Sequence, residues 1–139
     1  MEEDLMTRLR SDEELAGLLG KYKGRALVDW TNRPDTKILP AIVMYRVSAG
    51  VDYDQENPDE LEGPRVQFSI ISATYGEGAL AFRRLRRLLE TEATVGGTIF
   101  GKAFLDASRD LNPKDLPGGK REYLRAADFI IWNRRADPK

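Results

Sequence analysis

The chain has 139 residues, of which 22 are Lys or Arg and 23 are Asp or Glu, so its formal net charge is −1. This balance argues against a general nucleic-acid coat or a polybasic membrane anchor, because both need excess positive charge to meet phosphate. The sequence contains no Cys and no His, which removes disulfides, thiolate nucleophiles and the usual neutral-pH proton carrier. Most enzyme mechanisms therefore lack their usual side chains here, and we expect a single soluble domain over residues 1–139 with no bound metal or cofactor and no export signal.

Residues 2–19 are predicted to form two short helices, because apolar side chains recur there at helical spacing among charged ones. Ser11 and Glu14 have the spacing of a capping box at the start of the second helix, and Gly20 follows where a left-handed C-terminal cap is expected. Residues 21–37 mix Gly, Asn and Pro with a few apolar positions, which indicates a connector with one short extended piece.

Two strands are predicted at 38–47 and 65–72 from their β-branched and aromatic residues. In the second strand apolar and polar residues alternate, so one face is expected to be buried. The segment 48–64 between them carries six carboxylates and no basic residue. Such a segment buries too little apolar surface to offset its ordering entropy, so we expect a mobile acidic hairpin loop. Its carboxylates belong to Asp52, Asp54, Glu56, Asp59, Glu60 and Glu62.

The strongest helix prediction covers about residues 75–91, where Thr74 and Glu77 form a second capping box. Apolar residues lie along one side of this helix, and arginines occupy much of the remainder. One interpretation of the arginines is a solvated face. The other is a contact surface for acids of a neighbouring copy, such as the 48–64 loop, with a phosphate contact as a further possibility. The arginines are Arg83, Arg84, Arg86 and Arg87.

Residues 98–108 and 122–134 are predicted as two further strands, joined by the turn-forming segment 112–119. Residues 135–139 are predicted to be a frayed tail. The predicted order is helix, helix, strand, strand, helix, strand, strand. Two hairpins with a helix between them indicate an α+β fold, in which an antiparallel sheet of about four strands carries helices on one face.

Gly96 to Lys102 has the G-x-x-x-x-G-K spacing of a phosphate-binding loop. The next residue is Ala103, which has no hydroxyl for magnesium. The segment also leaves a predicted helix and enters a β-rich run, whereas a phosphate loop leaves a strand and opens a helix. We therefore interpret it as a turn and a strand.

Pro34, Asp35 and Lys37 follow the order of the proline-aspartate and lysine elements of metal-dependent nucleases, which hold magnesium beside the scissile phosphate. The full pattern needs a second acidic-x-lysine pair on a neighbouring core strand. The later candidate, residues 137–139, lies in the predicted tail. A small metal-dependent nuclease is therefore kept only as a lesser alternative.

Asp106, Asp110 and Asp128 lie in or near predicted strands. Two carboxylates held together there would have separated pKa values, as acid and base catalysts require. Sequence spacing does not bring them together. We expect the more common arrangement, in which aspartates at strand edges face solvent or pair with an arginine, here Arg109, Arg125 or Arg134.

Four short sequence segments occur in an order that is typical of one protein family. They are Asp-Glu-Glu-Leu-Ala-Gly-Leu-Leu-Gly at 12–20, Leu-Pro-Ala-Ile-Val at 39–43, the strand 65–72 running directly into Ala-Thr-Tyr at 73–75, and Ala-Phe-x-x-Leu-x-x-Leu-Leu at 81–89. Over most of residues 2–134 the chain resembles the tail-terminator, or tail-completion, proteins of long-tailed bacteriophages and related gene-transfer particles. It departs from their pattern in its longer acidic hairpin and in the connector around 28–30.

The resemblance implies a non-enzymatic virion protein, of which about six copies form a ring on the head-proximal end of the tail tube. The ring would stop tube growth and provide the head-joining surface. Implied partners are other copies of the chain, the tail tube protein and a head–tail connector or neck protein. Assembly would take place in the host cytoplasm, without membrane or direct nucleic-acid contact. The alternative within the same particle is another neck or head-joining component.

A head-to-tail ring closes when one patch of a subunit complements a different patch on its neighbour. Opposite local charges supply that asymmetry. We therefore expect the acidic and arginine-rich segments to be the main contact surfaces. The expected interface residues are Asp52, Asp54, Glu56, Asp59, Glu60, Glu62, Arg83, Arg84, Arg86 and Arg87.

Overall fold

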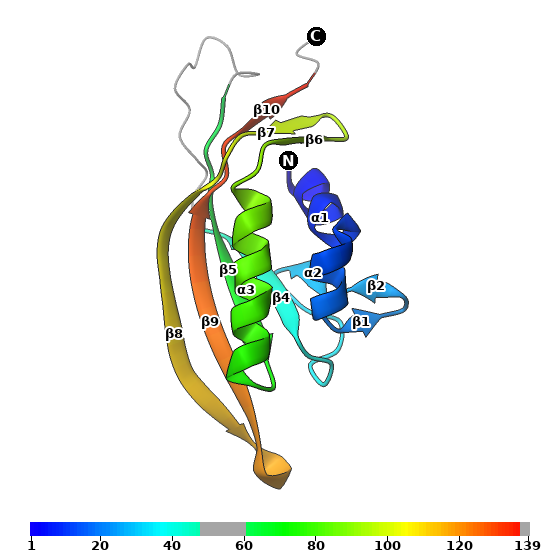
Figure 1. Cartoon of the computed structure of the whole chain (residues 1–139), viewed down its shortest axis with the longest axis vertical. Helices are drawn as coiled ribbons and strands as arrows, with labels where there is room; N and C mark the ends of the chain where they lie inside the picture. Colours follow the sequence, from blue (N-terminus) through cyan, green and yellow to red (C-terminus); the bar gives the residue numbers. More distant parts are fainter. Residues whose placement is uncertain (48–60, 137–139) are drawn as a thin grey trace.

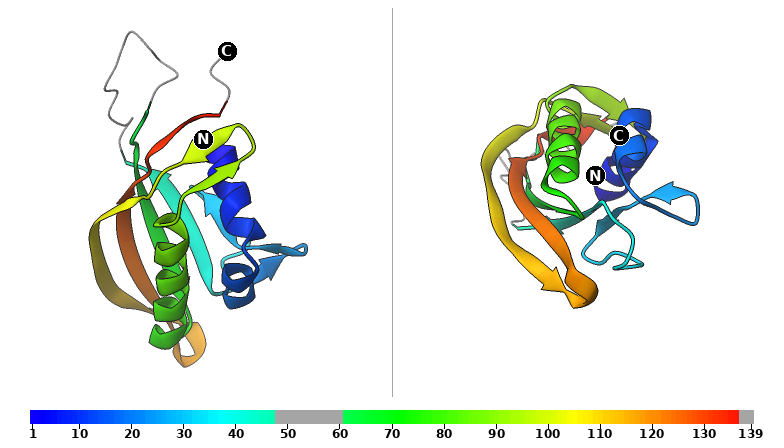
Figure 2. Two further views of the ribbon diagram at one scale, coloured as in Figure 1. Left: turned by 45° about the horizontal axis from the view of Figure 1, so that its top comes forward. Right: turned by 60° about the horizontal axis from the view of Figure 1, so that its bottom comes forward.

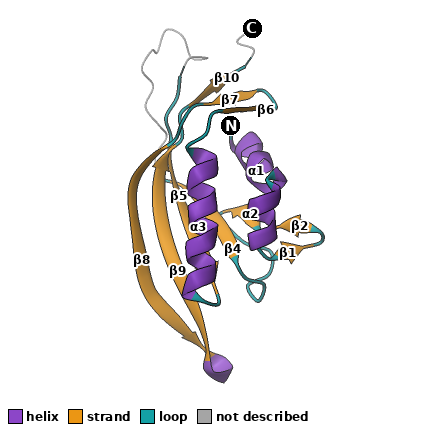
Figure 3. Cartoon of the chain, in the orientation of Figure 1, coloured by secondary structure: helices purple, strands orange, loops and turns teal. Residues whose placement is uncertain are grey.

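The computed structural model describes residues 1–47 and 61–136. Over these residues, helices pack on one face of a five-stranded sheet, flanked by two smaller sheets (Figures 1 and 3). The helices are α1 Glu2–Ser11, α2 Glu13–Leu18 and α3 Tyr75–Leu89. The main sheet contains β3 Val28–Trp30, β4 Ala41–Arg46, β5 Arg65–Ser72, β8 Phe104–Leu116 and β9 Lys120–Ile130. This confirms the α+β class, and none of the described helices is long and apolar enough to cross a bilayer.

The small sheets are built from short strands. The first pairs β1 Lys21–Tyr22 with β2 Arg25–Ala26, and the second has the order β10 Asn133–Arg135, β7 Thr98–Phe100, β6 Ala93–Val95. The predicted connector at 21–37 therefore holds three short strands, because it also contains β3. β3 has the sequence Val-Asp-Trp, which is too short for its apolar-polar alternation to identify a strand, and its burial does not alternate, since Val28 and Asp29 are both buried.

The main sheet has the strand order β3-β4-β5-β9-β8. β3 runs parallel to β4, and every other neighbouring pair is antiparallel. The prediction of a purely antiparallel sheet of about four strands is therefore wrong, because β3 adds a fifth, parallel strand at one edge.

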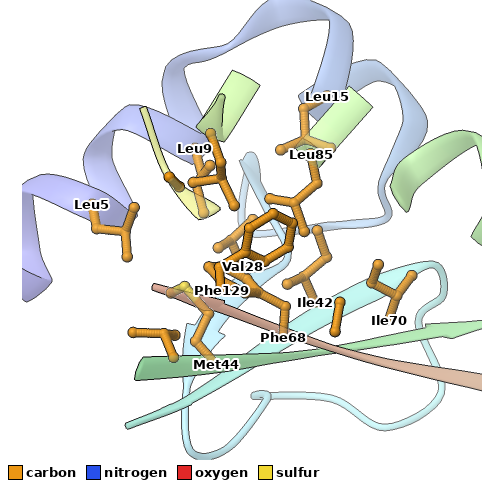
Figure 4. Packing of buried hydrophobic residues seen from close by; sticks show 14 of the residues in the cluster. Leu5, Leu9, Leu15, Val28, Ile42, Met44, Phe68, Ile70, Leu85 and Phe129 are labelled. Carbon is orange, nitrogen blue, oxygen red and sulfur yellow. The ribbon is translucent and has the colours of Figure 1, made fainter. Parts of the chain in front are cut away.

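The core lies between this sheet and the three helices (Figure 4). Alternation along β5 buries Val66, Phe68 and Ile70, which are at most 1% exposed. Phe68 meets Phe129 of β9 edge to face, with ring centroids 5.5 Å apart and planes at 89°. From the helix layer, Leu85 of α3 packs into the same cluster. The cluster fixes α3 against the centre of the sheet.

The predicted N-terminal capping residue is correct for α3 and wrong for α2. Thr74 caps α3 as predicted, because its Oγ1 accepts the Glu77 amide at 3.2 Å. The capping residue of α2 is Asp12, whose Oδ2 accepts the Leu15 amide at 2.9 Å. Ser11, the expected cap, is the last residue of α1. Asp12 takes this role because α1 and α2 are separated by that single residue.

Gly20 is required for close packing, and the expected left-handed cap is wrong. Leu19 ends α2 in an extended conformation with φ −104° and ψ 157°, and Gly20 has no positive φ. The Gly20 amide donates to the carbonyl of Pro40 at 2.8 Å. A Cβ at Gly20 would lie 2.6 Å from Ile38 Cγ2, so a side chain has no room there.

The C-terminal half is divided more finely than expected. The predicted strand 98–108 consists of β7 and the start of β8, and the predicted strand 122–134 consists of most of β9 and the start of β10. β6 and β7 form a hairpin that turns at Gly96, with φ 58°, and Gly97. β8 has 13 residues and β9 has 11, and their hairpin extends beyond the N-terminal end of α3 (Figures 1 and 2).

The turn predicted over 112–119 is confined to Pro117–Gly119. Asn112 and Pro113 instead belong to β8, where the pairing register shifts between Leu111 and Lys114. A bulge in an edge strand tolerates proline, because the missing amide removes no ladder hydrogen bond. Turn-forming residues therefore sit inside a strand.

Most of the predicted 48–64 loop, including five of its six carboxylates, lies outside the described residues. Glu62 is described, and its backbone exchanges two hydrogen bonds with Asn133, of 2.8 and 2.9 Å. The predicted tail 135–139 begins within structure, because Arg135 pairs with Thr98 in the β10–β7 ladder. Residues 137–139 lie outside the described part.

Candidate assembly surface

The four arginines of α3 do not form one free surface. Arg84 donates two hydrogen bonds to Asp12, from Nε at 2.9 Å and from Nη2 at 2.7 Å, and its Nη1 lies 3.0 Å from Glu14 Oε2. These hydrogen bonds raise the pKa of Arg84 above its ordinary value and hold the pKa of Asp12 below its own. Arg86 pairs with Glu90 at 3.2 Å. Two of the four arginines are thus used within the subunit.

Arg83 and Arg87 are exposed, and their side chains form no ion pair or hydrogen bond with any described residue. They line a hollow of about 330 Å³ between α2 and α3, together with Leu18 and Leu80. Leu80 is 49% exposed. The positions of Leu80, Arg83 and Arg87 on α3 place all three on one helix face. We call this feature the arginine hollow. It combines two unpaired positive charges with apolar surface.

Arg8 of α1 fixes the C-terminal end of α3. Its Nη2 donates to the carbonyls of Leu88, at 2.6 Å, and of Thr91. Its guanidinium also lies 5.4 Å from the centre of the Phe100 ring. Only 7% of Arg8 is exposed, and burial lowers its pKa. A positive charge at a helix C-terminus is favourable, so Arg8 holds the helix that carries the arginine hollow in place.

The three candidate aspartates are all paired with arginines. Asp106 and Asp128 both pair with Arg65, whose Nη2 lies 3.1 Å from Asp128 Oδ2. The hydrogen bonds that Arg65 donates to Asp106 and then to Asp128 raise its pKa. Asp110 accepts a hydrogen bond from Arg125 Nε at 2.9 Å. The Asp110–Arg125 pair is one of the expected pairings, whereas Arg65 was not among the expected arginines.

The two segments that have the spacing of a phosphate loop and of a nuclease metal site do not form those sites in the structure. Gly96 forms the β6–β7 turn, and Lys102 lies in the loop between two strands, so this G-x-x-x-x-G-K segment opens no helix. Asp35 Oδ1 accepts the Lys37 amide at 2.8 Å, which forms a local turn. Among the described residues, no group of three or more Asp, Glu, Cys or His is arranged to hold a metal ion.

β8 forms a long edge of the main sheet. Of the described strands, only β9 pairs with it, so its other side presents unpaired backbone groups. Nearly every residue of β8 is exposed, including Phe104 at 59% and Leu111 at 40%. The opposite edge, β3, has three residues and contacts α1. Open backbone groups on one side only provide a surface for pairing with another chain.

A second candidate surface was missed by sequence reasoning. A groove of about 1160 Å³ lies between the β8–β9 turn and the loop before β4, and we call it the tip groove. Its basic lining residues are Arg33, Lys37, Lys114, Lys120 and Arg121. The sequence shows basic residues on both sides of the turn Pro117–Gly119. It does not show that Lys37 joins them, because the fold alone brings the two segments together.

The sequence and the fold were compared with those of known proteins. No protein-family model matches the chain. A putative ABC transporter ATP-binding protein of Clostridium tetani (strain Massachusetts / E88) is 25% identical over 117 residues. The match covers 84% of this chain, and the chain spans 23% of that relative's length.

Among solved structures, a chain in the virion of a native gene transfer agent particle superposes with a TM-score of 0.58 and 12% identity. The match covers 96% of this chain and 94% of that chain. At this identity the likeness shows a shared fold. It extends over nearly the full length of both chains, and the particle is of the class that the sequence resemblance indicated.

Proposed function

We propose that this chain is a non-enzymatic virion protein that forms a ring of about six copies on the head-proximal end of a phage-like tail tube. The ring stops growth of the tube and provides the surface to which a head–tail connector or neck protein binds. The observation that carries the proposal is the shared fold with a chain of a gene transfer agent virion over 96% of the present chain. The position at the end of the tube comes from the sequence resemblance to tail terminators.

The two sides of the sheet support a ring. A closed ring needs two different patches on each subunit, because the contact is head to tail. The main sheet ends on one side in the exposed 13-residue strand β8 and on the other in the short strand β3. Exposed Phe104 and Leu111 add apolar area to the β8 edge. This asymmetry suits a contact in which β8 lies against a different surface of the neighbouring copy.

The arginine hollow is a further proposed contact. Arg83 and Arg87 are available to acidic groups of the tube or neck partner, whereas Arg84 and Arg86 already pair with residues of the same subunit. Ion pairs at the rim of an interface set the orientation and rate of docking more than its final affinity. The hollow therefore serves to select and orient the partner.

The likeness to a putative ABC transporter ATP-binding protein leads to no proposal of nucleotide binding. The segment with phosphate-loop spacing turns a β-hairpin here, and its glycine and lysine do not precede a helix. Backbone amides at the start of a helix are what such a loop offers to phosphate.

Electron microscopy of particles lacking the chain tests the proposal. Loss of a tail terminator should give overlong tails, and supplying the wild-type chain should restore normal length. The competing assignment is another neck component, which the shared virion fold also suits. Headless tails that are all of normal length would favour that assignment and contradict ours.

A further inference from the structure

The tip groove carries positive charge that the subunit does not neutralise. Arg33 Nη2 lies 3.5 Å from Glu122 Oε2, and Arg121 Nε lies 2.9 Å from Asp115 Oδ1, so both arginines are paired. Across the described residues, no side-chain hydrogen bond or ion pair involves the lysines of the groove. One nitrogen of Arg33, Nη1, is also buried without a hydrogen-bond partner in that part of the chain. The lysines are Lys37, Lys114 and Lys120.

The strongest complementary charge in the sequence is attached at the other end of the sheet. The acidic segment from Asp52 to Glu62 follows β4 and precedes β5 in the chain. Glu62 is bonded to Asn133 of β10, beyond the C-terminal end of β9, whereas the residues of β9 that line the tip groove are its first four, Lys120 to Tyr123. The two ends of β9 lie at opposite ends of the main sheet (Figure 1). The eleven residues of β9 span about 35 Å.

The acidic segment does not reach the far end of the tip groove in its own subunit. Thirteen residues lie between Val47 and Leu61. A chain of that length, extended outward and back, reaches at most about 22 Å. Lys120, the first residue of β9, lies about the full length of that strand away from the segment's anchor at Glu62, so carboxylates that contact Lys120 must come from a different copy of the chain.

We propose that the tip groove binds the acidic segment 52–62 of a second copy, with its carboxylates against Lys37, Lys114 and Lys120. The groove and the segment are different patches, so two bound copies still have one free groove and one free segment between them. Further copies can bind to these free sites until the rotation from copy to copy closes a ring. The inference rests on the proposed function only in placing copies side by side.

Nucleic acid is the competing polyanion for the same lysines. The chain as a whole has a net charge of −1, so it lacks the long-range attraction to phosphate that nucleic-acid-binding domains have. The acidic segment offers six carboxylates and is present at the same concentration as the groove. The segment of another copy is therefore the favoured occupant.

Zero-length carbodiimide cross-linking tests this contact, because it joins lysines only to carboxylates in direct contact. A mixture of ¹⁴N- and ¹⁵N-labelled chain, at high concentration, should give isotopically mixed cross-links between the acidic segment and the three groove lysines. Lys21, Lys23 and Lys102 are exposed and lie outside the groove, so they serve as internal controls. Absence of mixed cross-links, or equal linking to the control lysines, would overturn the inference.

A charge swap gives a second, independent measurement. Lys37→Glu/Lys114→Glu/Lys120→Glu and Asp52→Lys/Asp54→Lys/Glu56→Lys should each weaken self-association at least about tenfold in sedimentation. An equimolar mixture of the two variants should associate again. Circular dichroism checks that each variant is folded, and Lys21→Glu/Lys23→Glu/Lys102→Glu, at three exposed lysines outside the groove, is the matched control for charge alone.

The same variants decide between the acidic segment and nucleic acid as the occupant of the groove. Association of the groove variant at wild-type strength contradicts the inference, as does an equal loss of association in the Lys21/Lys23/Lys102 control. Binding of duplex DNA that requires the groove lysines, with self-association unchanged, assigns the groove to nucleic acid and also overturns it. Tail length in particles is a separate readout, so the proposed function can fail while this contact stands, and the reverse.

Discussion

Arg84 of α3 binds Asp12, the capping residue of α2, through two hydrogen bonds that join residues 72 positions apart. The same carboxylate accepts the Leu15 amide. One side chain therefore both starts α2 and ties it to α3. Arg84 is committed to the fold, and the charge that α3 offers to a partner comes from its neighbours Arg83 and Arg87.

The Asp12 pair predicts a pH-dependent stability. The pKa of Asp12 is lowered, first by its hydrogen bonds with Arg84, so the folded state favours the ionised carboxyl. This stabilisation is fully present above the unfolded-state pKa of about 3.9 and is lost as the pH falls through the lower folded-state value. Asp12→Asn, which keeps a capping oxygen, should lower the free energy of unfolding by about 1–2 kcal/mol at pH 7.

Urea unfolding of wild type and Asp12→Asn at several pH values measures this effect. The difference between the two proteins should be constant from pH 7 to about pH 5 and should shrink below about pH 4. A difference that stays the same down to pH 2 would show that the charge of Asp12 contributes nothing.

The arginines of α3 should separate into two groups on substitution. Arg83→Gln/Arg87→Gln removes a like-charge pair at i, i+4 and should raise the free energy of unfolding by a few tenths of a kcal/mol, about 0.2–0.5. Arg84→Gln should lower it by about 1–3 kcal/mol, because it leaves Asp12 without its charged partner. Thermal and urea unfolding measure both. Equal effects of the two variants would contradict the division of the face.

Arg8→Met should destabilise the fold through the end of α3. The substitution keeps an unbranched apolar stem but removes the donors to the carbonyls of Leu88 and Thr91. Losing hydrogen bonds from a charged donor costs about 1–3 kcal/mol in the free energy of unfolding. Arg83→Met, at an exposed position of α3, is the control and should change stability by less than about 0.5 kcal/mol. Equal losses would remove the role assigned to Arg8.

Two glycine-to-alanine substitutions should have opposite signs. At Gly63 a Cβ would lie 2.5 Å from Trp132 Cζ3, whereas at Gly17, within α2, it meets nothing within 4 Å. Gly63→Ala should displace the Trp132 ring and lower the free energy of unfolding by about 1–3 kcal/mol. Gly17→Ala should raise it by about 0.5–1 kcal/mol through helix propensity. Tryptophan fluorescence should shift in the first variant only.

Local patterns predicted the elements whose features are themselves local. The alternation around Phe68 defined β5, and the Thr74 capping box defined the start of α3. β3 was not predicted as part of the sheet, because its three residues depend on pairing with Ile42 and its neighbours on β4. The length of β8 was hidden because an edge strand exposed on most of its surface has no apolar alternation, and Pro113 looks like a turn residue.

The candidate surfaces depend even more than the strands on contacts between residues that are distant in the sequence. The four arginines of α3 were identified from sequence, but their division into paired and unpaired groups depends on Asp12 and Glu90 at positions set by the fold. The tip groove was missed because Lys37 and Lys120 approach one another only after β4, β5 and β9 are aligned. Charge runs are visible in a sequence, whereas charges gathered from distant segments are not.

The backbone bridge between Glu62 and Asn133 links the segment before β5 to the N-terminal helix through a chain of hydrogen bonds. Asn133 belongs to β10, β10 pairs with β7, and the Thr98 hydroxyl of β7 donates to Asp4 of α1 at 2.6 Å. Tension applied at Glu62 would therefore pass through this bridge, the β10–β7 ladder and the Thr98–Asp4 hydrogen bond into α1. The load would be shared by three separate segments of the chain instead of peeling β5 alone away from the sheet.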